Sequence, residues 1–97
     1  MRARKLFQYK SHQGEVLVDM VIWDLPAPTT ERPHGLKYRL FCGRTNECVV
    51  RYDNETTKGD HRHYGEHEEL YRFESPEKLI VDFRNDCARL AGWRWEK

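Results

Sequence analysis

The spacing of apolar residues changes once along this chain, and this change limits the fold more than any other feature of the sequence. Before Phe73, apolar residues tend to alternate with polar ones, as they do in strands with one covered face. After Ser75 they recur every three or four residues, as they do in an amphipathic helix. The sequence therefore predicts an α+β domain in which strands precede one helix.

The predicted strands are separated by turn residues and by a proline-rich connection. Residues 26–34 hold three of the four prolines and cannot continue a strand ladder. Gly43-Arg44-Thr45-Asn46 is a good turn sequence between two alternating runs. Strands are predicted over residues 4–10, over 15–25, in a hairpin over 36–53, and in a short edge strand over 70–73. Together they predict an antiparallel sheet of four to five strands.

The helix has clear sequence signals at both ends. Ser75 is placed to cap it, Pro76 suits its first position, and Gly92 is a natural stop. Its apolar stripe comprises Leu79, Ile80, Phe83, Cys87, Leu90 and Ala91. We expect this C-terminal amphipathic helix to pack on one face of the sheet.

Length and composition narrow the class of protein. At 97 residues, the chain predicts one domain over residues 1–97. Seventeen basic residues nearly balance 16 acidic ones, so nucleic-acid affinity would need local clusters of charge. Three cysteines without Cys-x-x-Cys spacing suit a reducing compartment. No apolar run approaches the length of a membrane span, and we expect a cytoplasmic protein without membrane contact.

Residues 58–64 carry the densest chemistry in the chain, with the sequence Lys-Gly-Asp-His-Arg-His-Tyr. In an extended segment, His61 and His63 share one face and Asp60 and Arg62 lie on the other. The two imidazoles would then be neighbours, since residues two apart on a strand are about 6.5 to 7 Å apart. One could take a proton from a ribose 2′-hydroxyl while the other protonates the leaving 5′-oxygen, because both protonation states of imidazole are populated near neutral pH. This predicts RNA cleavage without a cofactor.

The neighbours of the two histidines have expected roles as well. Lys58 or Arg62 could supply a cation for the phosphorane oxygens. Asp60 is the stronger candidate to fix a histidine tautomer, and Asp53 is the weaker one. The hypothesis is therefore an endoribonuclease whose catalytic residues are His61, His63, Asp60, Lys58 and Arg62.

Two other interpretations of the same segment stay open. His-x-His on a strand can chelate a divalent metal, with His67, Asp60 or Glu66 completing the site, and this would make a metal-dependent hydrolase. Lys58 and Arg62 would repel such an ion, which favours metal-free catalysis. Alternatively, the segment is a solvated surface, and the chain is a non-catalytic module that binds RNA or protein through its basic N-terminal strand and its Trp-rich tail.

Several motifs together resemble the TumE family of small bacterial and archaeal type II toxins. They are Tyr52-Asp53-Asn54, Lys58-Gly59-Asp60-His61-Arg62-His63, Tyr71-x-Phe73, Ser75-Pro76-Glu77-x-Leu79 and Asp82-Phe83. The likeness covers nearly the whole chain. It implies a ribonuclease toxin that is encoded beside a helix-turn-helix antitoxin, and it implies the same site at Lys58, Asp60, His61, Arg62 and His63. The expected partners are thus the antitoxin and RNA, and the chain is compatible with a homodimer.

Overall fold

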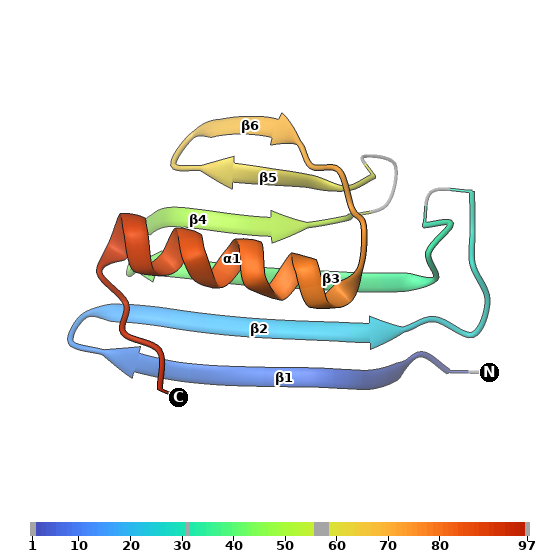
Figure 1. Ribbon diagram of the computed structural model, residues 1–97, viewed down its shortest axis with the longest axis horizontal. Helices are drawn as coiled ribbons and strands as arrows, with labels where there is room; N and C mark the ends of the chain where they lie inside the picture. The colour runs from blue at the N-terminus through green and yellow to red at the C-terminus, as the bar shows by residue number, and fades with distance from the viewer. Residues whose placement is uncertain (1, 31, 56–58, 97) are drawn as a thin grey trace.

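The computed structural model describes residues 2–30, 32–55 and 59–96. Its strands form one antiparallel sheet in which every strand pairs with its neighbours in sequence (Figure 1). The elements are β1 (Arg4–Gln13), β2 (Val16–Asp24), β3 (Leu36–Arg44), β4 (Glu47–Asp53), β5 (His61–Tyr64), β6 (His67–Leu70) and α1 (Pro76–Ala91). The predicted α+β class with a C-terminal helix on one face is confirmed, whereas the predicted strand number was too low, because the sheet has six strands.

The additional pairing comes from the segment after β4. Residues 61–64 and 67–70 form a second hairpin around Gly65, whose φ of 61° is a conformation that favours glycine. The edge strand predicted over 70–73 was therefore placed too late, since β6 ends at Leu70 and Tyr71 packs into the core. The acidic residues that precede Leu70 had suggested a solvated connection, but an edge strand tolerates charge along its exposed side.

α1 has the termini that its sequence predicts. The Ser75 side chain accepts a hydrogen bond from the Lys78 N–H at 3.0 Å, and Gly92 ends the helix in the left-handed conformation. Leu79, Phe83 and Cys87 are fully buried beneath the helix. They pack on the alternate positions of the strands that face α1, including Val18, Met20, Ile22, Leu40, Val50 and Tyr52.

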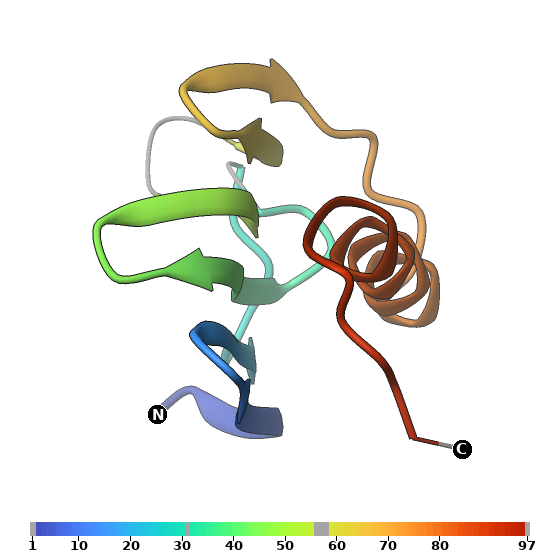
Figure 2. The same ribbon diagram turned by 90° about the vertical axis from the view of Figure 1, so that its left-hand side faces the viewer.

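Figure 2 shows α1 on one side of the sheet, and the described residues leave the opposite side without a helix. We call this side the open face. Two cross-strand rows of neighbours lie on it. From β1 to β6, the first row is Lys10, Asp19, Phe41, Arg51, His63 and Glu68, and the second is Gln8, Val21, Arg39, Asp53, His61 and Leu70. In the described part of the chain, no helix is long and apolar enough to span a membrane.

Candidate active site

β5 presents His61 and His63 side by side on the open face. The ring centroids are 5.0 Å apart, which confirms the expected extended geometry and shared face. β5 pairs with β4 so that His61 lies opposite Asp53 and His63 lies opposite Arg51. The hairpin of β5 and β6 therefore brings the histidines to two charged residues of the preceding strand, and these four side chains form the centre of the site.

Asp53 is the carboxylate at this centre. Its Oδ1 lies 2.6 Å from Nε2 of His61, and its Oδ2 lies 3.0 Å from Nε of Arg51. Asp53 is only 1% exposed. A buried carboxylate requires compensating cations, and here the Arg51 guanidinium and the His61 ring provide them. Asp53 thus holds both neighbours in place.

The contacts of His61 define where its protons are. Its Nδ1 is 2.9 Å from the carbonyl oxygen of Gly59, which can only accept, so Nδ1 carries a proton. Its Nε2 lies 2.6 Å from Oδ1 of Asp53, which is an ion-pair distance, although neither carboxylate oxygen of Asp53 has a hydrogen-bond partner among the described residues. His61 therefore carries a proton on Nδ1 and has a carboxylate beside its Nε2.

His63 has the opposite arrangement. Nη2 of Arg51 is 3.0 Å from Nε2 of His63, and a guanidinium can only donate, so this nitrogen offers its lone pair. Burial lowers the pKa of His63, and the charge of Arg51 lowers it further. His63 is thus a neutral imidazole. The two rings therefore differ in their neighbours: Nε2 of His61 lies beside a carboxylate, and Nε2 of His63 lies beside a guanidinium.

Glu68 of β6 lies in front of both rings. Its Oε2 is 3.1 Å from Nε2 of His61 and 3.4 Å from Nε2 of His63. Its side chain is 41% exposed, whereas that of His61 is 4% exposed. A cavity of about 320 Å³ lies beside it, lined by His61, Glu68, Glu69 and Leu70. The Glu68 carboxylate oxygen therefore occupies a position between two imidazoles that an oxygen of a bound phosphate could also take.

The other predicted site residues are placed differently. Lys58 lies outside the described residues. The Asp60 carboxylate accepts from the Tyr38 hydroxyl at 2.6 Å and is 3.0 Å from Nε2 of His34, so its contacts are not with the histidine pair. Asp53 takes the role that was expected of Asp60. Asp60 instead fixes the entry to β5 against β3.

Arg62 points to the face that α1 covers. Its Nη2 is 2.7 Å from Glu69, and its Nη1 donates to the Tyr52 hydroxyl at 3.3 Å. Its guanidinium also lies over the rings of Tyr64 and Tyr71, at 5.3 and 5.7 Å from their centroids. Side chains alternate between the two faces along β5, so His61 and His63 share one face and Arg62 lies on the other. The cation beside the histidine pair is therefore Arg51 and not Arg62.

The expected metal set also changes. His67 is 68% exposed and contacts Glu69, away from the pair. The ligand atoms that converge are instead those of Asp53, His61 and His63, which lie within 4.8 Å of one another. Two imidazole nitrogens and a carboxylate oxygen suit a transition metal in type and spacing. Arg51, however, already donates to His63 and places a fixed positive charge beside these atoms.

Two residues of the site were missed from the sequence. Arg51 lies in the hairpin predicted over 36–53, and Glu68 precedes the predicted edge strand, but neither was assigned a role in the site. The useful signal was the alternation of side chains along β4. If the end of β4 pairs with the histidine segment, Arg51 and Asp53 lie on the same face as the histidines, as the cross-strand neighbours of His63 and His61.

Comparison with known proteins identifies the family. The family model described as "Toxin TumE" matches residues 3–91. Neither the search of curated proteins nor the search of solved structures found a match.

Proposed function

The chain belongs to the TumE toxin family, and we propose that this toxin is an RNA endonuclease that cleaves with its own side chains. One observation supports the proposal most: the Nε2 atoms of His61 and His63 meet at one carboxylate oxygen of Glu68, with the Asp53 carboxylate beside His61 and the Arg51 guanidinium beside His63. A base and an acid on either side of a phosphate are what 2′-hydroxyl attack on RNA requires.

We assign the roles from these neighbours. Arg51 releases Nε2 of His63, this nitrogen takes the proton of the ribose 2′-hydroxyl, and the oxygen attacks the adjacent phosphorus. His61 gives its Nε2 proton to the 5′-oxygen, which leaves as a hydroxyl. The products are a 2′,3′-cyclic phosphate and a 5′-hydroxyl end. In this step His63 has gained one proton and His61 has lost one. Asp53 orients His61, and Glu68 must turn away before the phosphate enters.

Cleavage of RNA by the purified protein in EDTA tests this proposal. We expect products that end in 2′,3′-cyclic phosphate, and we expect His61→Ala and His63→Ala each to lower the rate by roughly 100-fold or more. His67→Ala is the matched control, because His67 is exposed on the other side of β6. Full activity in both folded pair variants would rule out the proposal, and growth arrest that survives both changes would support the non-catalytic module.

The cluster of Asp53, His61 and His63 supports a second candidate, a metal-dependent hydrolase. In that case EDTA abolishes cleavage, and added Zn²⁺ or Mn²⁺ restores it. Asp53→Ala would then lower metal affinity together with activity. Retained cleavage in EDTA decides against this candidate.

Membership of a toxin family implies an antitoxin partner. We propose that this partner is a helix-turn-helix protein encoded next to the toxin gene. Inspection of the neighbouring reading frames and co-purification of their product with the toxin test the proposal.

A further inference from the structure

The open face continues from the histidine pair towards the centre of the sheet, and its next residues on β3 are basic and aromatic. Arg39 is the cross-strand neighbour of Asp53, and Phe41 is that of Arg51. Adjacent strands are about 4.8 Å apart, so Arg39 lies roughly 10 Å from β5. That distance suits contact with a polymer that extends beyond the scissile phosphate.

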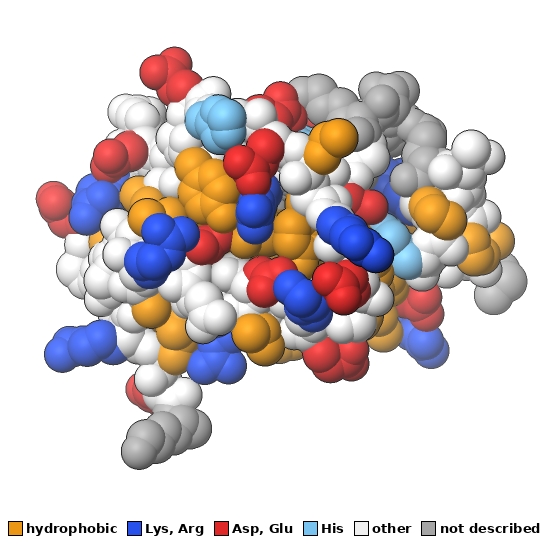
Figure 3. All heavy atoms as spheres, turned by 45° about the horizontal axis from the view of Figure 1, so that its top comes forward, with side chains coloured by type: hydrophobic (Ala, Val, Ile, Leu, Met, Phe, Trp, Pro, Cys, Tyr) orange, Lys and Arg blue, Asp and Glu red, His pale blue; other side chains and the backbone are white. Residues whose placement is uncertain are grey.

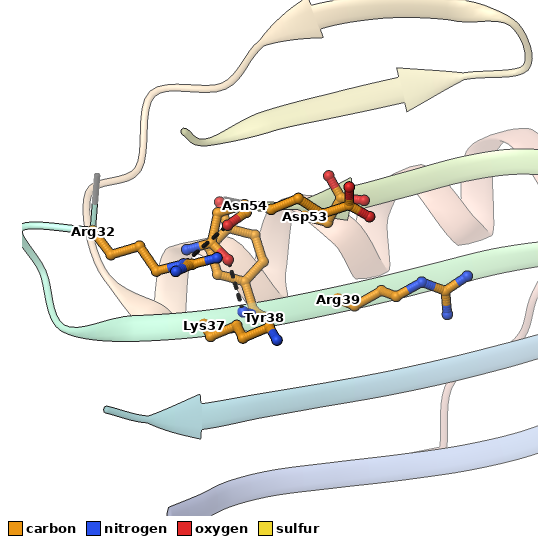
Figure 4. Close-up of a pocket in the computed structure, with 7 residues that line it drawn as sticks. Arg32, Lys37, Tyr38, Arg39, Asp53 and Asn54 are labelled. Atoms are coloured by element: carbon orange, nitrogen blue, oxygen red, sulfur yellow. Dashed lines mark hydrogen bonds between the residues drawn. The ribbon is translucent and has the colours of Figure 1, made fainter. Parts of the chain in front are cut away.

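A cavity of about 420 Å³ opens on this part of the face (Figure 4). Figure 4 shows Lys37 and Arg39 extending from β3 on the side away from α1, beside Asp53 and Asn54 at the end of β4. Arg32, Tyr38 and Glu55 complete its lining. Lys37 and Arg39 are exposed, because they alternate along β3 with the buried residues that face α1. Their charges are therefore available to an anion in solvent.

The floor of the cavity is rigid. Asn54 is only 1% exposed, its Oδ1 accepts from the Tyr38 N–H at 2.9 Å, and its Nδ2 donates to the Leu36 carbonyl at 2.8 Å. Nε of Arg32 donates to the Asn54 carbonyl at 3.0 Å. These bonds join β3, β4 and the proline-rich connection, so the cations of β3 are presented on a fixed surface.

Aromatic rings are interleaved with the cations. The Arg39 guanidinium lies 5.4 Å from the centroid of Phe41, and Lys5 Nζ lies 5.3 Å from that of Trp23. Both rings are half-buried on the open face. Acidic neighbours of this group are Asp19, beside Phe41, and Asp53, beside Arg39. Cations that follow a backbone, with rings on which bases stack, are the components of a surface for single-stranded nucleic acid.

The other side of the molecule differs. Over α1 and the β5–β6 hairpin, basic and acidic side chains are interspersed (Figure 3). Lys78 pairs with Asp82 there, and Arg89 pairs with Asp86. Cations already paired with carboxylates gain less from a phosphate, so the open face is the more favourable side for RNA.

We infer that the open face along β3 binds the single-stranded RNA that flanks the scissile phosphate, with Lys37 and Arg39 contacting its phosphates and Phe41 stacking on a base. The inference rests on the proposed function for the position of the scissile phosphate. It adds the substrate class, which is an unpaired strand, because only unstacked bases can reach a ring that lies on a sheet.

The test uses a fluorescent single-stranded RNA in which every ribose is 2′-O-methylated. This probe lacks the attacking hydroxyl, so binding is measured apart from cleavage. We expect Arg39→Glu to weaken binding roughly tenfold or more and to reduce the slope of log affinity against log salt by about 0.7 to 1. Arg94→Glu is the matched control, because Arg94 is exposed in the tail after α1 and the change in charge is the same.

Each outcome decides the inference. The inference is supported if Arg39→Glu binds the probe more weakly and Arg94→Glu binds it as the wild type does. If the same protein leaves unmodified RNA intact, only the proposed catalysis is contradicted. The inference is overturned if the two variants bind the probe with equal affinity. It is also overturned if the wild-type protein binds no probe, even when that protein cuts unmodified RNA. In either overturning case, the open face would be assigned to the antitoxin instead.

Discussion

Asp53 Oδ1 lies 2.6 Å from His61 Nε2, although the two residues belong to different hairpins and both side chains are at most 4% exposed. Oδ2 of the same carboxylate lies 3.0 Å from Nε of Arg51, so removal of the Asp53 charge leaves the Arg51 guanidinium without this partner. We expect Asp53→Asn to lower the free energy of unfolding by about 3 to 5 kcal/mol. Urea denaturation measures this, and a loss below about 1 kcal/mol would show that the contacts of the Asp53 carboxylate contribute little to stability.

In the proposed mechanism, Arg51 sets the pH range in which His63 acts as a base. Burial and the Arg51 charge lower the pKa of His63, so the neutral ring persists to lower pH than in an ordinary histidine. Arg51→Gln removes the charge, and the pKa of His63 rises. We expect the acid limb of the pH–rate profile to move to higher pH. NMR titration of His63 checks the same shift directly, and an unmoved titration would contradict the assignment.

In the proposed mechanism, Glu68 competes with the substrate for the space between the two rings. Replacing it by Ala removes a carboxylate that must otherwise leave before a phosphate binds. We expect Glu68→Ala to bind 2′-O-methylated RNA several-fold more tightly, whereas Glu66→Ala in the neighbouring exposed turn has little effect. If Glu68→Ala instead abolishes cleavage, Glu68 is itself a catalytic residue.

Gly59 holds His61 through its backbone. Its φ of 72° disfavours a side chain, while no atom of the described residues beyond its chain neighbours lies within 4 Å of the position that a Cβ would take. Gly59→Ala should therefore cost about 1 to 2 kcal/mol of stability through the backbone alone. Gly14→Ala is the control, because Gly14 has a similar φ of 59° and an equally open surrounding. We expect a similar loss of stability in both variants, but reduced cleavage only in Gly59→Ala, since its carbonyl accepts from His61 Nδ1.

Arg62 stabilises the hairpin from the covered face. Its bonds to Glu69 and Tyr52 tie β5 to β6 and β4. We expect Arg62→Gln to lower the unfolding free energy by about 1 to 3 kcal/mol while the folded enzyme keeps its cleavage rate. Thermal melts and rates measured well below the transition separate the two effects. A large loss of rate in fully folded protein would return Arg62 to the catalytic group.

The elements with strong local patterns could be predicted from the sequence. The helix from Pro76 was defined by its cap, its proline and its apolar stripe, and each of these acts within one turn of the chain. The shared face of His61 and His63 followed from alternation alone. The edge strand was predicted over residues 70–73 and not at His67–Leu70, because the pattern of β6 is polar and its position depends mainly on pairing with β5.

The sequence by itself determined that two imidazoles would stand on one face of a strand, because the two-residue period of an extended chain is a local property. Only the tertiary structure decided which charges surround them. Asp53 and Arg51 come from β4, and Glu68 comes from β6, because antiparallel register places these residues opposite His61 and His63. Register is fixed by burying the alternate face against α1, so the partners of each histidine depend on the packing of the whole sheet.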